Sequence, residues 1–108
     1  MPRYISNTLT FATATVTTGV SYAAAINDRV LCTAGGITIT LPISTSLTVG
    51  DTVQIIDVTG AAGSSNITVA RNGANIQGLA EALVIDINNA APILVYTGAT
   101  YGWIVSGS

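Results

Sequence analysis

Lysine and histidine are absent from this chain of 108 residues, and its only cations are Arg3, Arg29 and Arg71. Three scattered arginines form no basic patch, so the chain lacks the electrostatic attraction that supplies most non-specific affinity for nucleic acid. The lack of histidine excludes the common zinc ligand sets and the histidine-dependent catalytic triads. We therefore expect no nucleic-acid binding, no metal, no cofactor and no catalytic residue.

Cysteine and long apolar runs are also scarce. Cys32 is the only cysteine, so no disulfide can form within the chain. It lies in an apolar stretch, and a buried role is favoured over a nucleophilic one because no histidine can activate it. No run of eighteen uncharged apolar residues exists, which excludes a membrane-spanning helix. The N-terminus lacks the apolar segment of a signal peptide, so we expect synthesis in a cytoplasm and no membrane insertion.

Charge itself is rare. Charged residues make up 7% of the chain and its net charge is -2, whereas about 25% is usual for soluble domains. A solitary domain keeps neighbours away with mixed surface charge, and the buried centres of protein interfaces are depleted of it. The composition therefore favours a homo-oligomer or a lattice component. The alternative is a secreted β protein that solubilises itself with Thr and Asn.

What the chain does contain is a series of short apolar runs rich in Val and Ile. Each run is bounded by Gly, Pro, Asn or Ser, and the runs recur about every ten residues, which indicates an all-β fold. They cover residues 29–33, 37–41, 51–58, 66–71, 83–87, 93–97 and 103–105. We predict a compact antiparallel β-sandwich or jelly-roll-like barrel of about seven or eight strands.

Local patterns refine this prediction. Residues 37–41 alternate Ile or Leu with Thr, as in a strand with one face on a core. The loop 34–36 and the pair Asn72-Gly73 are both compatible with hairpins. Residues 55–56 and 83–85 lose the alternation, which predicts strands buried on both faces.

The first 28 residues are predicted to be an extended N-terminal arm ahead of a core domain at residues 29–108. Residues 4–18 alternate without a strongly apolar face, which suits a segment whose register is fixed by another chain, or an edge strand. Residues 20–26 fit either a strand or a helical turn.

Five of the eight charged residues lie between Gly50 and Asn89. Asp57 and Asp86 each sit in an apolar run, and Arg71 is the only cation nearby in the sequence. A carboxylate inside a β core usually meets an arginine or several backbone N–H groups. We hypothesise a structural ion pair of Arg71 with Asp57 or Asp86, in preference to a glycosidase-like carboxylate pair. Trp103, the only tryptophan, is expected to cap the core with its indole N–H bonded to a carbonyl.

The segments GGITITLP, VGDTVQIIDVTG, NITVARNGANIQGL, ALVIDINNA and ILVYTGATYGW follow one another within residues 29–105. This succession resembles a module of tailed-bacteriophage virion proteins, found in distal parts of tail fibres and in small structural proteins. The resemblance implies a compact, non-catalytic β domain that acts as a trimer. In tail fibres a long shaft usually precedes the module, whereas here only some 28 residues do.

A short chain of this kind suits a capsid decoration (cement) protein on the capsid surface of the virion, made in the host cytoplasm. Its expected partners are itself, as a homotrimer, and the major capsid protein. The arm should reach neighbouring subunits, and Tyr4, Ile5, Leu9 and Phe11 are expected to contact the capsid because they lack a face to bury within one subunit.

Two other functions stay open. In a tail-fibre or receptor-binding module, Tyr96, Tyr101 and Trp103 would contact glycans of the host surface. A cellular carbohydrate-binding or adhesive β module unrelated to phage would instead be a monomer in solution.

Overall fold

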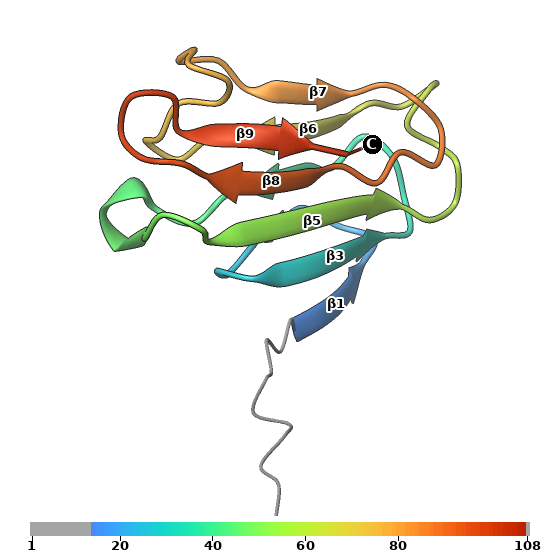
Figure 1. The fold of residues 1–108 in the computed structure, drawn as a ribbon. Coiled ribbons are helices and arrows are strands. Elements are labelled where there is room, and N and C mark those ends of the chain that lie inside the picture. Colours follow the sequence, from blue (N-terminus) through green and yellow to red (C-terminus); the bar gives the residue numbers. More distant parts are fainter. Residues whose placement is uncertain (1–13, 108) are drawn as a thin grey trace, which may run out of the picture.

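The computed structural model describes residues 14–107 (Figure 1). These residues form nine β-strands and one 3₁₀ helix (Ser44–Ser46), and this range contains no α-helix. The strands are β1 (Ala14–Thr18), β2 (Tyr22–Ala23), β3 (Asp28–Cys32), β4 (Thr38–Thr40), β5 (Thr52–Asp57), β6 (Ile67–Ala70), β7 (Leu83–Ile85), β8 (Ile93–Tyr96) and β9 (Trp103–Ser106). The all-β prediction is confirmed, but the strands number nine rather than seven or eight.

The strands form two separate sheets and not a closed barrel. One sheet has five strands in the order β1-β3-β5-β8-β9, and the other has four in the order β2-β4-β6-β7. The two sheets lie as layers in Figure 1, with a shared core of buried side chains. The architecture is therefore sandwich-like.

Strand direction differs from the prediction. The chain alternates between the two sheets from β1 to β6, and successive strands within each sheet are parallel. The first six strands consequently form three stacked coils, each with one strand in either sheet. Antiparallel pairing begins only with β7, β8 and β9. The prediction of antiparallel pairing was wrong because the glycines at 35–36, which suit a hairpin, instead carry the chain from β3 across to β4 in the other sheet.

The turn at Asn72-Gly73 is present, with φ angles of 46° and 102°. A type I′ turn requires such positive angles at both central residues. It does not join neighbouring strands directly, however, because β6 ends at Ala70 and its antiparallel partner β7 begins at Leu83.

The core lies between the sheets and is built from the inward side chain of every second residue. It includes Val30, Ile39, Ile55 and Trp103, each with 0% of its surface exposed. Complete burial of one such aliphatic side chain stabilises the fold by about 1.5–3 kcal/mol.

Part of the predicted arm belongs to the sheets. Residues 14–28 include β1, which pairs with β3, and β2, which pairs with β4. Ala24 contributes to the core, with 6% of its surface exposed. The remainder of the predicted arm lies outside the described residues, and Tyr4, Ile5, Leu9 and Phe11 lie there with it.

Candidate interaction surfaces

The outward face of the five-stranded sheet is apolar. Strand residues in register share one face of a sheet. Gln54, the partner of the exposed Arg29, therefore points outward, and so does Ile93, the partner of Gln54. By the same register the aliphatic residues of this face are Leu31, Ile56, Ile93, Val95 and Ile104. We call these five residues the outer aliphatic face.

Charge is nearly missing from this face. Arg29 is the only charged residue of β1, β3, β5, β8 and β9 that points outward, and its Nε donates a hydrogen bond to Oε1 of Gln54 at 3.2 Å. The remaining outward positions of these five strands hold Thr, Gln or Ser.

The outward face of the four-stranded sheet differs. Its half-buried residues are small or hydroxylated, namely Thr38, Thr40, Thr68 and Ala70. Only Val84 adds a larger aliphatic side chain, which is 50% exposed. The two faces of the sandwich are therefore unequal, and the five-stranded sheet presents the more apolar one.

These observations correct the prediction that residues 55–56 and 83–85 are buried on both faces. Ile55 and Ile85 are buried in the core, but Ile56 and Val84 point outward. Neither outward side chain is fully buried, because Ile56 is half-buried and Val84 is 50% exposed. The lost alternation at residues 55–56 was nevertheless a sequence signal for the outer aliphatic face, to which Ile56 belongs.

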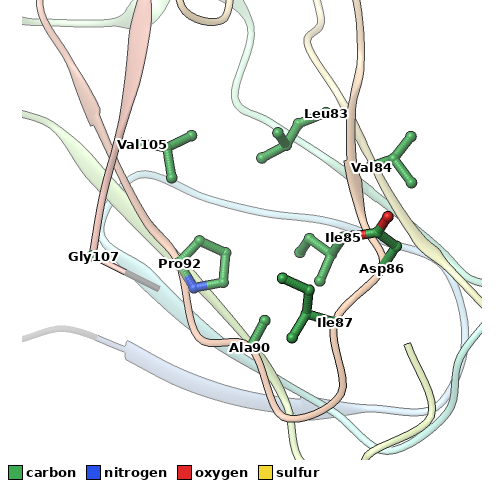
Figure 2. A pocket seen from close by; sticks show the side chains of 9 residues that line it. All are labelled: Leu83, Val84, Ile85, Asp86, Ile87, Ala90, Pro92, Val105 and Gly107. Carbon is green, nitrogen blue, oxygen red and sulfur yellow. The ribbon is translucent and has the colours of Figure 1, made fainter. Parts of the chain in front are cut away.

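A second apolar surface is a groove of about 150 Å³ between the edge strands β7 and β9. It is lined by Leu83, Val84, Ile85, Asp86, Ile87, Ala90, Pro92, Val105 and Gly107. Figure 2 shows Leu83, Ile85 and Ile87 opposite Pro92 and Val105. We call this hollow the β7 groove. Sequence patterns missed it because its walls come from three separate segments.

The three residues of the predicted ion pair lie in separate environments. Nη1 of Arg71 donates to the carbonyl oxygen of Ala74 at 3.3 Å, while Asp86 is exposed at the rim of the β7 groove. The carboxylate of Asp57 instead binds backbone N–H groups, which is the other environment expected for a buried carboxylate. No ion pair joins Arg71 to either carboxylate among the described residues.

Asp57 lies at the end of β5 with 1% of its surface exposed. Its Oδ2 accepts hydrogen bonds from the N–H groups of Ala62 and Asn89, both at 3.0 Å, and its Oδ1 accepts one from Ala61 at 3.2 Å. Burial acts to raise the pKa of Asp57, but the backbone hydrogen bonds outweigh burial and hold the pKa below its ordinary value. The carboxylate therefore stays ionised and joins two loops to the core.

Asp28 is a second buried carboxylate, and no sequence pattern indicated its burial. Its Oδ2 accepts hydrogen bonds from the hydroxyl of Tyr22 and from the N–H of Ala25, both at 2.8 Å. The hydrogen bond to Asp28, followed by burial and the carboxylate charge, raises the pKa of Tyr22. Asp28 thus fixes the turn between β2 and β3.

The three aromatic residues expected to bind glycans are mostly internal. Trp103 is fully buried and meets Tyr96 edge to face, with ring centroids 5.6 Å apart. Tyr96 is 9% exposed, so only Tyr101, at 64%, is accessible. Trp103 caps the core as predicted, but its indole N–H has no hydrogen-bond partner among the described residues.

Burial and then the charge of Asp57 raise the pKa of the Cys32 thiol to about 11. Residues 14–107 contain no group of three or more Cys, Asp or Glu side chains that could hold a metal ion. No helix in the same range is long and apolar enough to cross a membrane.

The chain matches no known protein family, and no curated protein is significantly similar to it.

Proposed function

We propose that this chain is a non-enzymatic structural protein of a bacteriophage virion, a capsid decoration (cement) protein that binds the outer capsid as a homotrimer. The observation that carries the proposal is the outer aliphatic face, five aliphatic side chains on a sheet whose strands direct only one charged residue, Arg29, outward. Depletion of charge is characteristic of the buried centres of interfaces.

The size of this face fits a protein that acts in several copies. Five strands spaced about 4.8 Å apart, each about 15 Å long, cover roughly 360 Å² of sheet. A stable interface needs about 800 Å² from each partner, so a single face binds weakly. A trimer that engages three shell subunits together binds much more tightly, because the later contacts form at high effective concentration.

Such a protein strengthens a shell by joining capsid subunits, and it needs no reactive side chain to do so. The major capsid protein is the partner on the shell side. The resemblance to phage virion modules, carried by residues 29–105, supports the same conclusion from the sequence.

Gold-labelled antibody against this protein, applied to intact virions and viewed by electron microscopy, tests the proposal. Label spread over the heads is the expected result. Label confined to the tail tips would replace decoration with the alternative, a tail-fibre or receptor-binding module, for which the exposed Tyr101 is the available aromatic contact. Virions without label would overturn both functions.

A further inference from the structure

The outer edge of β7 is open. In β6, the N–H of Thr68 donates to the carbonyl oxygen of Ile37, just before β4, at 3.0 Å. Successive residues of a strand direct their backbone groups to opposite sides. Ile67 and Val69 therefore direct theirs toward β7, where they are paired with Ile85 and Leu83.

Val84 lies between those two paired residues of β7, so its N–H and C=O point away from β6. No strand within residues 14–107 pairs with β7 on that side. A further strand can add there, because an unpaired edge offers N–H and C=O groups at the spacing that an extended chain needs.

The facing edge of β9 is already occupied. The N–H of Gln77 donates to the carbonyl oxygen of Trp103 at 2.7 Å, and the N–H of Trp103 donates to the carbonyl oxygen of Asn75 at 2.8 Å. The N–H of Val105 donates to Oε1 of Gln77 at 3.0 Å. The β7 groove is thus open to hydrogen bonding along β7 alone, with aliphatic side chains beneath that edge (Figure 2).

The N-terminal residues match this groove in pattern and charge. In an extended chain Ile5, Leu9 and Phe11 share one face, which suits an aliphatic groove. Arg3 is the only charged side chain before Asp28. The two charged residues beside β7, Glu81 and Asp86, are both acidic and exposed.

Chain length decides which subunit receives the segment. β1, where the described chain begins, lies four strands away from β9 in the five-stranded sheet. Four spacings of about 4.8 Å make roughly 19 Å, and an extended chain needs about six residues to cover that distance. Leu9 and Phe11 would fall within this crossing and could not reach the groove of their own subunit.

We propose that residues 5–11 of one copy of the chain add to the outer edge of β7 in a second copy, with Ile5, Leu9 and Phe11 in the β7 groove. This contact replaces the capsid contact that the sequence analysis expects for Ile5, Leu9 and Phe11. It joins subunits to one another and leaves the outer aliphatic face free for the shell. It does not depend on where in a virion the protein acts.

Photo-cross-linking of the full chain tests this contact. Leu9 is replaced by benzoylphenylalanine, and chains labelled with ¹⁴N or ¹⁵N are mixed in equal amounts while unfolded and then refolded together. The three arginines give tryptic peptides 4–29, 30–71 and 72–108, so the arm and the β7 groove separate. We expect cross-links between 4–29 and 72–108, with mixed-isotope pairs as abundant as the two unmixed kinds together.

Cross-links in unmixed pairs only, cross-links to 30–71, or no cross-links would each overturn the proposal. Benzoylphenylalanine at Thr8, on the opposite face of the segment, is the matched control and should give a several-fold lower yield. Val84→Pro removes the outward N–H without removing a bond to β6. It should abolish the cross-link while the buried-type fluorescence of Trp103 shows that the domain remains folded.

Discussion

Asp57 joins residues 61–62 and residue 89 to the end of β5 through one carboxylate. Its three donors are backbone N–H groups, which leave no mark in a sequence. The sequence therefore indicates that a buried carboxylate needs partners, and it suggests Arg71 because arginine is the only visible candidate. The loops at 60–63 and 88–89 fold back to the strand end, and that arrangement becomes apparent only in three dimensions.

Replacing Asp57 with Asn should destabilise the domain at pH 7 by about 2–3 kcal/mol. The amide keeps one acceptor oxygen and places an NH₂ group against N–H donors, so charge-assisted hydrogen bonds worth about 1.5–3 kcal/mol are lost. Urea unfolding followed by Trp103 fluorescence measures the change. Asp86→Asn is the control for charge alone, because Asp86 is exposed, and it should stay within about 0.5 kcal/mol of the parent.

The stabilisation by Asp57 should also depend on pH. Its pKa is lower in the folded protein than in the unfolded chain, so the contribution is complete above the unfolded value of about 3.9 and disappears as the pH falls through the folded value. The difference in unfolding free energy between the parent and Asp57→Asn should therefore shrink below about pH 4. A difference that stayed constant from pH 7 to pH 2 would contradict this assignment.

Cys32 should be inert toward thiol reagents in the folded protein. Its pKa of about 11 leaves almost no thiolate at pH 8, and its side chain is fully buried. We expect no reaction with Ellman's reagent at pH 8 in buffer and complete reaction in denaturant. Asp57→Asn should leave the folded thiol unreactive, because burial is the larger cause of the raised pKa.

At the scale of strands and turns, the clearest demand for glycine lies before β9. Gly102 has a φ of +69°, and a Cβ there would overlap the carbonyl group of Asn75, which accepts the N–H of Trp103. Gly36 has nearly the same φ, +72°, but open space around its Cα. The two positions therefore separate backbone strain from steric overlap.

Gly36→Ala should cost about 1–2 kcal/mol, which is the cost of a positive φ at a residue with a side chain. Gly102→Ala should cost several kcal/mol more, because residues 75–77 would have to leave the edge of β9. Thermal unfolding of the two variants gives the comparison. Equal losses would show that the approach of Asn75 to Gly102 is not tight in solution.

The positions of the strands could be predicted from the sequence, and their partners could not. Each apolar run that we expected as a strand overlaps one, because β-branched residues and flanking breakers are local signals. Pairing is not local. β3 pairs with β5 in parallel, and the paired residues Arg29 and Gln54 lie 25 residues apart in the sequence. No turn residue marks that contact. A turn that carries the chain from one sheet to the other contains the same residues as a hairpin turn. Turn signals alone therefore do not distinguish the two arrangements.

At the scale of the whole molecule, the outer aliphatic face is the feature that the proposed shell partner would explain. Ile55-Ile56 predicts burial on both faces, yet Ile56 on the outward side of the five-stranded sheet is only half-buried. A core alone explains the inward residues. Five outward aliphatic residues in a chain this poor in charge require a further explanation, and a shell protein that covers them supplies one.

Replacing Ile56 or Val95 with Asp should therefore weaken binding to the shell more than it weakens the fold. Both side chains are half-buried and outside the core, so the free energy of unfolding should change by about 1 kcal/mol or less. A charge desolvated in the interface costs far more. Even a loss of only about 1.4 kcal/mol at each face lowers its affinity about tenfold, and three linked faces then lose up to about a thousandfold.

Co-sedimentation of purified protein with capsids that lack it measures this loss, and Thr68→Asp on the four-stranded sheet is the matched control. Thr68 is also a half-buried, outward strand residue, so it introduces the same charge on the opposite face. The control should bind as the parent does. The reverse ranking, with Thr68→Asp weak and Ile56→Asp unaffected, would assign the shell contact to the four-stranded sheet. In the contact that we propose, residues 5–11 act between copies of the chain, so neither substitution should change the cross-link from position 9. The cross-link therefore separates assembly of the oligomer from its attachment to the shell.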